Sequence, residues 1–279
     1  MNITLLANRD IASNLALNQL LPRLVDHQVT IFLSSQVGKK AGGPTTQLPP
    51  QALRDLRFIE QGLFNQLLSP LLATKQAAAG KPQLLSFAAL GEQLGRPLQV
   101  LNNINSPAGL ATFAASAPEL AISIRYGVIL RQPVIDVPPL GVVNLHSGLL
   151  PDYRGVMASF WALLNGAASL GTTLHYINDA SIDTGRIIGH SHLPVNAERS
   201  YLWHVLNLYP AGCDMIADLV DQLAQDRAVT TTPQPAAGSY YTFPTAAELE
   251  EFSRRGLHLY DGDELLGFFG QYLPAPAAP

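Results

Sequence analysis

Residues 3–33 of the chain, ITLLANRDIASNLALNQLLPRLVDHQVTIFL, give the clearest indication of its fold. This stretch opens with an apolar run at 3–7, continues through 12–25, where leucines recur at helical spacing, and closes with a β-branched run at 29–33. Strand, helix and strand in this order predict a βαβ unit, whose right-handed crossover joins two parallel strands. The stretch therefore predicts a parallel sheet that starts near residue 3.

The alternation of strands and helices continues along the chain. We expect helices over 51–73, 84–94 and 106–115, and strands over 97–101, 120–125 and 141–145. Residues 171–178 and 186–195 alternate as half-exposed strands do, and 200–225 is expected to be helical, with Pro210 restarting or kinking the helix. The predicted fold class is α/β, an open, mostly parallel, Rossmann-like sheet with flanking helices.

Two polar segments predict how the chain is divided. Residues 35–50 read as a loop, and residues 230–239 read as a linker because of their threonine, proline and glycine content. The segment from Tyr240 onward is too apolar to be disordered and too short for a core of its own. We therefore expect a main domain over 1–229, and a linker with a short C-terminal extension over 230–279 that packs back onto it.

Charge is scarce and unevenly placed. Charged residues make up 14% of the chain, against roughly 25% in typical soluble domains. The 17 basic and 21 acidic side chains give a net charge of −4. Residues 231–279 contain six acidic and two basic residues, so the whole excess lies there. A nucleic-acid partner is disfavoured, since it would require a basic surface.

Several classes of protein are excluded by what the sequence lacks. A single cysteine, Cys213, rules out a disulfide framework and a cysteine-built zinc site. His190 and His192 alternate on one strand, yet no carboxylate or thiol clusters beside them, so we expect no metal site. We expect no signal peptide, no contact with a membrane and a cytoplasmic location, because no long apolar run occurs.

The first turn between strand and helix bears on nucleotide binding. Residues 7–12 contain no glycine, whereas a dinucleotide fingerprint needs glycines there so that a pyrophosphate can approach the backbone. The chain also lacks the GxxxxGK[ST] pattern of a P-loop. An NAD-type site at this turn and a P-loop enzyme are both excluded.

The densest group of reactive residues follows the predicted strand 141–145. Asn144 and His146 are two residues apart, so they face the same side at the end of that strand, and Asp183 follows in a turn. An amide, an imidazole and a carboxylate suit acyl transfer, by stabilising an oxyanion and handling protons. A plainer interpretation makes Asn144 and His146 loop hydrogen-bonders and 183–185 an ordinary turn. An aspartic protease is excluded because no second Asp-Thr-Gly is present.

These residues resemble a known family. NLHSGLLPDYRG at 144–155, with DTG at 183–185 and SIRYGVIL at 123–130, is similar to the folate-dependent formyltransferases, which include enzymes acting on methionyl-tRNA, glycinamide ribonucleotide and sugar nucleotides. The resemblance covers roughly residues 84–225 well and the first 35 residues loosely. DYRG with FWALLNG at 160–166 matches best the enzymes that formylate small molecules.

The resemblance implies a site and a mechanism. Asn144, His146 and Asp183 would be catalytic, with Asn144 and His146 stabilising the oxyanion and Asp183 orienting His146. The formyl donor would be 10-formyltetrahydrofolate, and no metal would be needed. The donor would lie in an apolar pocket formed by two segments, which contain Tyr126, Gly127, Val128, Ile129, Asn178 and Ile182.

The chain also departs from the family's pattern. Gly148 stands where the family usually has serine, and Asn8-Arg9-Asp10 replaces the glycines of a phosphate-binding first turn. The enzyme for methionyl-tRNA carries a basic C-terminal domain, whereas the extension here is acidic, which favours a small-molecule amine as acceptor. Candidate acceptor-binding residues, each also readable as a loop hydrogen-bonder or anchor, are Arg9, Asn103, Asn105, Tyr153 and Arg154.

The sequence thus predicts an N-formyltransferase that uses 10-formyltetrahydrofolate on the amine of an amino sugar, a sugar nucleotide or an amino-acid derivative. A hydrolase of the same fold that releases formate from the donor is one alternative, and a binding module without catalysis is another. The family resemblance makes a homodimer possible. His175 is expected only to pair locally within its strand.

Overall fold

The architecture comes from a computed structural model, which describes residues 1–35, 48–74, 83–235 and 237–272. Most of the loop predicted at 35–50 therefore lies outside the described residues. Within the described part of the chain, no helix combines the length and the apolar character needed to cross a membrane.

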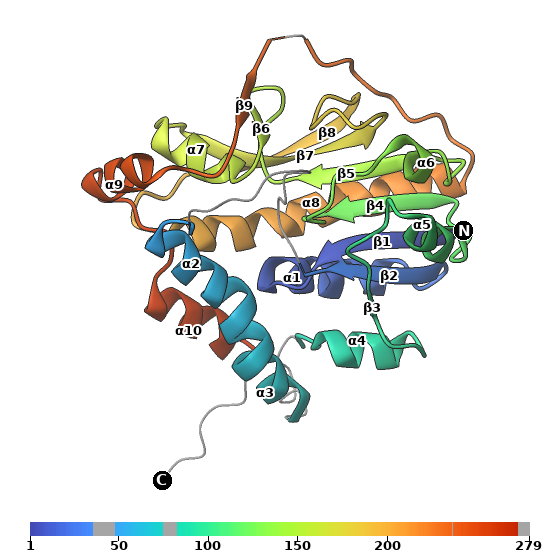
Figure 1. Cartoon of the computed structure of the whole chain (residues 1–279), viewed down its shortest axis with the longest axis horizontal. Coiled ribbons are helices and arrows are strands. Elements are labelled where there is room, and N and C mark those ends of the chain that lie inside the picture. The colour runs from blue at the N-terminus through green and yellow to red at the C-terminus, as the bar shows by residue number, and fades with distance from the viewer. Residues whose placement is uncertain (36–47, 75–82, 236, 273–279) are drawn as a thin grey trace.

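A seven-stranded sheet forms the centre of the molecule, in the order β3-β2-β1-β4-β5-β7-β8 (Figure 1). Five strands are parallel: β1 (Asn2–Asn8), β2 (Gln28–Ser34), β3 (Gln99–Val100), β4 (Leu120–Ile124) and β5 (Val142–His146). The last two strands pair in antiparallel fashion: β7 (Ser169–Ile177) with β5, and β8 (Ile187–Pro194) with β7. The sheet confirms the predicted fold class, although the strand expected at 97–101 is only two residues long.

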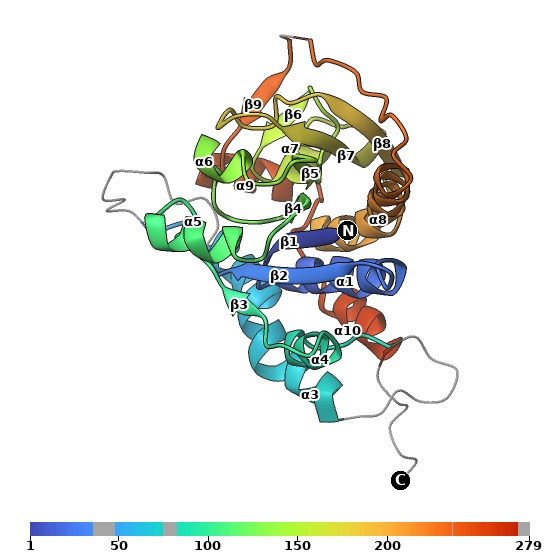
Figure 2. The same ribbon diagram turned by 90° about the vertical axis from the view of Figure 1, so that its right-hand side faces the viewer.

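Helices cover both faces of the sheet. Figure 2 shows α1 (Ile11–Leu20) and α8 (Tyr201–Ala224) on one side, and α5 (Pro107–Ala114) and α6 (Gln132–Ile135) on the other. Helix α8 runs through Pro210 without a break, where a restart or kink was expected. The remaining helices are α2 (Gln51–Arg57), the π-helix η2 (Phe58–Leu68), α3 (Ser69–Thr74), α4 (Phe87–Gln93), α7 (Ala158–Leu164), α9 (Ala246–Arg254) and α10 (Gly262–Gly270), with a short 3₁₀ turn at Leu21–Arg23.

The alternation of side chains along β5 assigns its residues to two cores. Val143 and Leu145 belong to the larger core, which also contains the buried residues of α1 and α8. Val142 belongs to a smaller core that contains Val134 of α6 and Phe113 of α5. Because side chains alternate along a strand, Asn144 and His146 project on the same side as Val142, away from α8.

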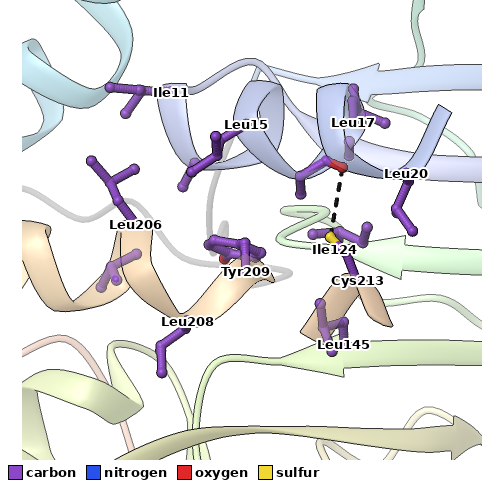
Figure 3. Close-up of a cluster of buried hydrophobic side chains, with 14 of the residues drawn as sticks. Ile11, Leu15, Leu17, Leu20, Ile124, Leu145, Leu206, Leu208, Tyr209 and Cys213 are labelled. Atoms are coloured by element: carbon purple, nitrogen blue, oxygen red, sulfur yellow. Dashed lines mark hydrogen bonds between the residues drawn. The ribbon is translucent and has the colours of Figure 1, made fainter. Parts of the chain in front are cut away.

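Close packing of α8 on the sheet depends on a glycine. A Cβ added at Gly212 would lie 2.8 Å from Cδ2 of Leu145, so only glycine lets α8 approach β5 this closely. One residue later, the Cys213 thiol donates to the carbonyl oxygen of Ala16 in α1, at 3.6 Å (Figure 3). Burial raises the pKa of Cys213 to about 12, so this thiol stays protonated and serves in packing.

The C-terminal extension packs onto the main domain through aromatic rings. Phe252 of α9 stacks on Phe160 of α7 with ring centres 4.4 Å apart, and Phe269 of α10 stacks on Phe64 at 6.3 Å. The strand β9 (Ser239–Tyr241) pairs in parallel with β6 (Tyr153–Gly155) as a separate two-stranded ribbon. Phe252 and Phe269 are both part of the larger core. The division of the chain at 229/230 stays a prediction.

A buried ion triad joins three elements at one end of the sheet. Arg125, directly after β4, donates through Nε to Oδ2 of Asp10 at 2.9 Å and through a terminal nitrogen to Oε1 of Glu60 at 2.9 Å. Asp10 also caps α1 by accepting from the backbone N–H of Ser13 at 2.8 Å. The triad therefore ties the turn between β1 and α1 to the end of β4 and to η2.

Replacing Glu60 tests the energetics of this triad. Burial, only partly offset by Arg125, raises the pKa of the Glu60 carboxyl from 4.5 to about 7. The folded protein therefore binds the proton of the Glu60 carboxyl more tightly than the unfolded chain does. Its free energy of unfolding falls as the pH rises from 4.5 to about 7. We predict that the free energy of unfolding declines between these pH values in the wild type, and that Glu60→Gln flattens this part of the decline. Urea titrations across pH measure it; Glu250→Gln, an exposed carboxylate on α9, should leave the slope unchanged.

Candidate active site

The carboxylate of Asp183 is the centre of the candidate site. It lies in the turn between β7 and β8, where Oδ2 accepts from the backbone N–H of Gly155 at 2.8 Å. The same oxygen is 3.5 Å from Nδ1 of His146, and Oδ1 is 3.5 Å from Nε2 of His175. Asp183 therefore sits between two imidazoles, with its side chain only 10% exposed.

His175 is the residue that sequence reasoning missed. In the antiparallel pairing of β5 with β7, His175 lies directly opposite Asn144. Directly paired residues of neighbouring strands point to the same face, so the register brings His175 beside Asn144 and Asp183. Its Nδ1 pairs locally, as expected, with the carbonyl oxygen of Tyr176 at 2.9 Å, but its Nε2 also faces Asn144 and Asp183. The alternation of 171–178 placed His175 on one face of its strand, but only the register between β5 and β7 shows what it faces.

The amide of Asn144 lies beside both His175 and Asp183. Its nitrogen, Nδ2, is 3.2 Å from Nε2 of His175 and donates to Oδ1 of Asp183 at 3.4 Å. Nε2 of His175 is itself 3.5 Å from the same carboxylate oxygen, so the three atoms form a nearly equilateral triangle. Nδ2 carries a second N–H besides the one that it donates to Asp183.

Both nitrogens of His146 face oxygen atoms. Nε2 donates to the carbonyl oxygen of Tyr153 at 2.7 Å, and Nδ1 faces Asp183. Gly148 makes this arrangement possible, because a Cβ there would lie 2.7 Å from Nε2 of His146 and 2.5 Å from Cβ of Ala158. The glycine that replaces the family's serine therefore makes room for the imidazole in this position.

The turn that carries Asp183 is strained and clamped. Asp183 has a φ of 55°, a left-handed conformation that costs energy for a non-glycine residue and is common at functional sites. A Cβ at Gly185 would lie 1.7 Å from the carbonyl oxygen of Tyr176, so the turn packs directly on β7. Gln234, in the predicted linker, donates through Nε2 to the carbonyl oxygens of Asp183 at 2.9 Å and Gly185 at 2.7 Å.

Electrostatics keeps Asp183 ionised. Burial by itself would raise the pKa of its carboxyl, but His146, His175 and the N–H of Gly155 together hold that pKa down at about 2. The carboxylate is therefore negative at any ordinary pH. Among the described residues, no three histidine, cysteine, aspartate or glutamate side chains gather in a way that could hold a metal ion.

The two segments expected to line a donor pocket follow β4 and β7, the two strands that flank β5. Tyr126 and Gly127 follow β4, where the Tyr126 hydroxyl donates to the carbonyl oxygen of Leu101 and the Gly127 N–H donates to Ser34 Oγ at 2.9 Å. Val128 is partly buried and Ile129 is 55% exposed. Asn178 follows β7, and Ile182 directly precedes Asp183 in the same turn. Whether they bind a donor stays a prediction.

The candidate acceptor-binding residues are placed in two groups. Tyr153 and Arg154 belong to β6, where the Tyr153 ring stacks on Tyr241 at 5.8 Å and Arg154 donates to the carbonyl oxygen of Gly238 at 3.0 Å. These contacts are loop anchors. The other group makes its contacts elsewhere. The Arg9 guanidinium donates to Asn65, and Asn105 donates to the carbonyl oxygen of Ile129 at 2.8 Å. Asn103 lies two residues before Asn105 in the chain.

Replacing His175 tests the coupling within this cluster. We predict that His175→Phe raises the pKa of the Asp183 carboxyl above about 2, because the variant removes a hydrogen bond and a neighbouring positive charge from it. The ¹³C shift of the labelled Asp183 carboxyl, followed by NMR against pH, measures the change. His192→Phe, at an exposed histidine on β8, is the matched control and should leave that pKa in place. An unchanged Asp183 pKa in His175→Phe would contradict the coupling.

Comparisons with known proteins agree with this geometry. Residues 96–202 match the family model described as formyl transferase, and this range includes Asn144, His146, His175 and Asp183. The chain is 35% identical over 203 residues to a methionyl-tRNA formyltransferase of Roseiflexus sp., a match that covers 72% of this chain and 60% of that protein. The chain thus accounts for about three fifths of the length of this curated relative.

Solved structures share the fold at low identity. A glycinamide ribonucleotide transformylase from Symbiobacterium toebii superposes with a TM-score of 0.54 at 16% identity, over 84% of this chain and 93% of that one. An N-formyltransferase from Helicobacter canadensis, solved with folinic acid and dTDP-3-aminofucose, gives 0.51 at 16% identity, over 87% and 71%. Residues 96–202 therefore match the formyl transferase family model, and the likeness to these solved structures shows that the chain shares their fold.

Proposed function

We propose that this chain is an N-formyltransferase that moves a formyl group from 10-formyltetrahydrofolate to the amine of a small molecule. The observation that carries the proposal is the placement of Asp183 between His146 and His175, with the Asn144 amide beside them at the carboxyl end of β5. Open α/β sheets bind their ligands at this end of the strands. The match of residues 96–202 to the formyl transferase family model supports this class of reaction.

The chain's own groups suit acyl transfer from such a donor. A folate donor would supply the activated formyl group, in a pocket beside Tyr126, Gly127, Val128 and Ile129 and the turn from Asn178 to Ile182. The second N–H of Asn144 would donate to the formyl oxygen as negative charge develops there. The Nε2–H of His146, now on the Tyr153 carbonyl, would be a second donor, for which the substrate oxygen competes. Asp183 would keep His146 oriented through its contact with Nδ1.

The surface of the C-terminal extension supports a small acceptor. Its six acidic and two basic residues after position 230 repel a polyanion, and the acidic α9 and α10 lie in the described structure. The N-terminus of α1, where a helix would offer its N–H groups to a phosphate, is already capped by the Asp10 carboxylate. Both features favour an amino sugar, a sugar nucleotide or an amino-acid derivative over methionyl-tRNA.

An acceptor screen with matched variants tests the proposal. Purified protein is incubated with 10-formyltetrahydrofolate and a panel of sugar nucleotides, hydroxylated ornithine, free amino acids and methionyl-tRNA. We predict release of tetrahydrofolate together with a small-molecule product heavier by one formyl group. Asn144→Ala should lower kcat by about 10²–10³-fold, the usual loss for one oxyanion donor. His146→Ala should also lower kcat strongly, whereas His192→Ala should leave it unchanged.

The outcomes separate the alternatives. Full turnover in His146→Ala would refute the assigned mechanism. Formylation of methionyl-tRNA alone would keep the transferase and overturn the small acceptor. Tetrahydrofolate released at the same rate with no amine present would identify a hydrolase instead, and binding of the donor without any turnover would identify a binding module.

A further inference from the structure

A second cavity lies among α1, α8 and α10, apart from the candidate active site. Its volume of about 650 Å³ falls within the roughly 300–1,000 Å³ typical of small-molecule sites. None of the residues assigned above to the trio, the donor or the acceptor lines it. Asn144 and His146 project away from α8, whereas this cavity is built on α1 and α8, so the two sites are separate.

The walls of the cavity combine an apolar surface with excess negative charge. Leu15 of α1, Leu206 of α8 and Phe268 of α10 contribute apolar side chains. Four carboxylates line the cavity, against a single arginine: Glu198, Asp261, Asp263 and Glu264. An apolar body with a positively charged end is complementary to such walls.

Two of these carboxylates have structural duties and two do not. Glu264 accepts from the backbone N–H of Ser200 at 3.2 Å and lies 3.7 Å from Arg199, and Asp261 caps α10. The ion pairs within the described part of the chain use neither Glu198 nor Asp263. The carboxylates of Glu198 and Asp263 are therefore available to form an ion pair with a cationic ligand.

Two further features of the wall bear on what it could bind. The Arg199 guanidinium lies over the Trp203 ring, 5.5 Å from its centre, so this ring is already paired with a cation. The amide oxygen of Gln19, which also lines the cavity, is buried and has no hydrogen-bond partner among the described residues. A buried acceptor without a donor is costly, so a ligand that donates a hydrogen bond there would be favoured.

We propose that this cavity binds a protonated organic amine with an apolar body, at a site separate from the formyl-transfer site. The apolar body would lie against Leu15, Leu206 and Phe268, and the ammonium would face Asp263 and Glu198. The proposal concerns binding alone, so it stands or falls independently of the proposed function.

Calorimetry with 2-phenylethylamine as the probe tests the proposal on the full chain. Two probes of matched shape, 2-phenylethanol and 3-phenylpropionate, replace the ammonium with a neutral or a negative group. We expect saturable binding of the amine, at least tenfold weaker binding of the alcohol, and no measurable binding of the carboxylate. Higher salt should weaken amine binding, because charge attraction between exposed groups is screened.

Two variants locate the site on the molecule. Gly267 lines the cavity within α10, and a Cβ added there meets nothing within 4 Å, so Gly267→Leu fills the space without a clash and suits a helix. It should abolish binding. Gly262→Leu, on the same helix and equally open but outside the cavity wall, should bind as the wild type does. Asp263→Asn should weaken binding about three- to tenfold, and Glu250→Gln should not.

Three results would overturn the proposal. They are an absence of saturable amine binding by the wild type, binding of the carboxylate as strong as that of the amine, and unchanged amine binding by Gly267→Leu. Circular dichroism of each variant shows that it is folded, so a loss of binding is not mistaken for unfolding.

Discussion

The ion contacts of the Asp183 carboxylate are the interaction on which the candidate site depends. One oxygen faces His146 and the other faces His175, each at 3.5 Å, while the backbone of Gly155 donates to the carboxylate. A buried carboxylate is costly unless it is paired, and here three partners repay that cost and depress its pKa. The orientation of both imidazoles, and through His175 of the Asn144 amide, follows from this one charge.

The C-terminal extension supports the same carboxylate from two sides. Gln234 holds the turn at Asp183 in its left-handed conformation through two backbone carbonyls. Tyr241 of β9 stacks on both Tyr153 and Trp161, and so fixes the loop whose carbonyl binds His146. The segment after residue 230 is therefore also part of the scaffold of the site.

The fold could be predicted from the sequence, but the contacts that depend on register could not. Periodicity is enough to predict the sheet and the shared face of Asn144 and His146, because it is a local property of a strand. The role of His175 depends on pairing between β5 and β7, and that of Gln234 depends on where a polar linker docks. The triad of Arg125, Asp10 and Glu60 joins residues far apart in the chain, and no local pattern marks it.

The most direct measurement of the central claim is kcat for formyl transfer by Asp183→Asn. Asparagine has the same shape as aspartate and tolerates the left-handed backbone, so the variant removes the charge and keeps the turn. With the charge gone, His146 and His175 lose the carboxylate that both of them face. The account predicts a fall in kcat of at least about 10²-fold, while Asp152→Asn, an exposed control, keeps wild-type kcat. Wild-type kcat in Asp183→Asn would contradict it.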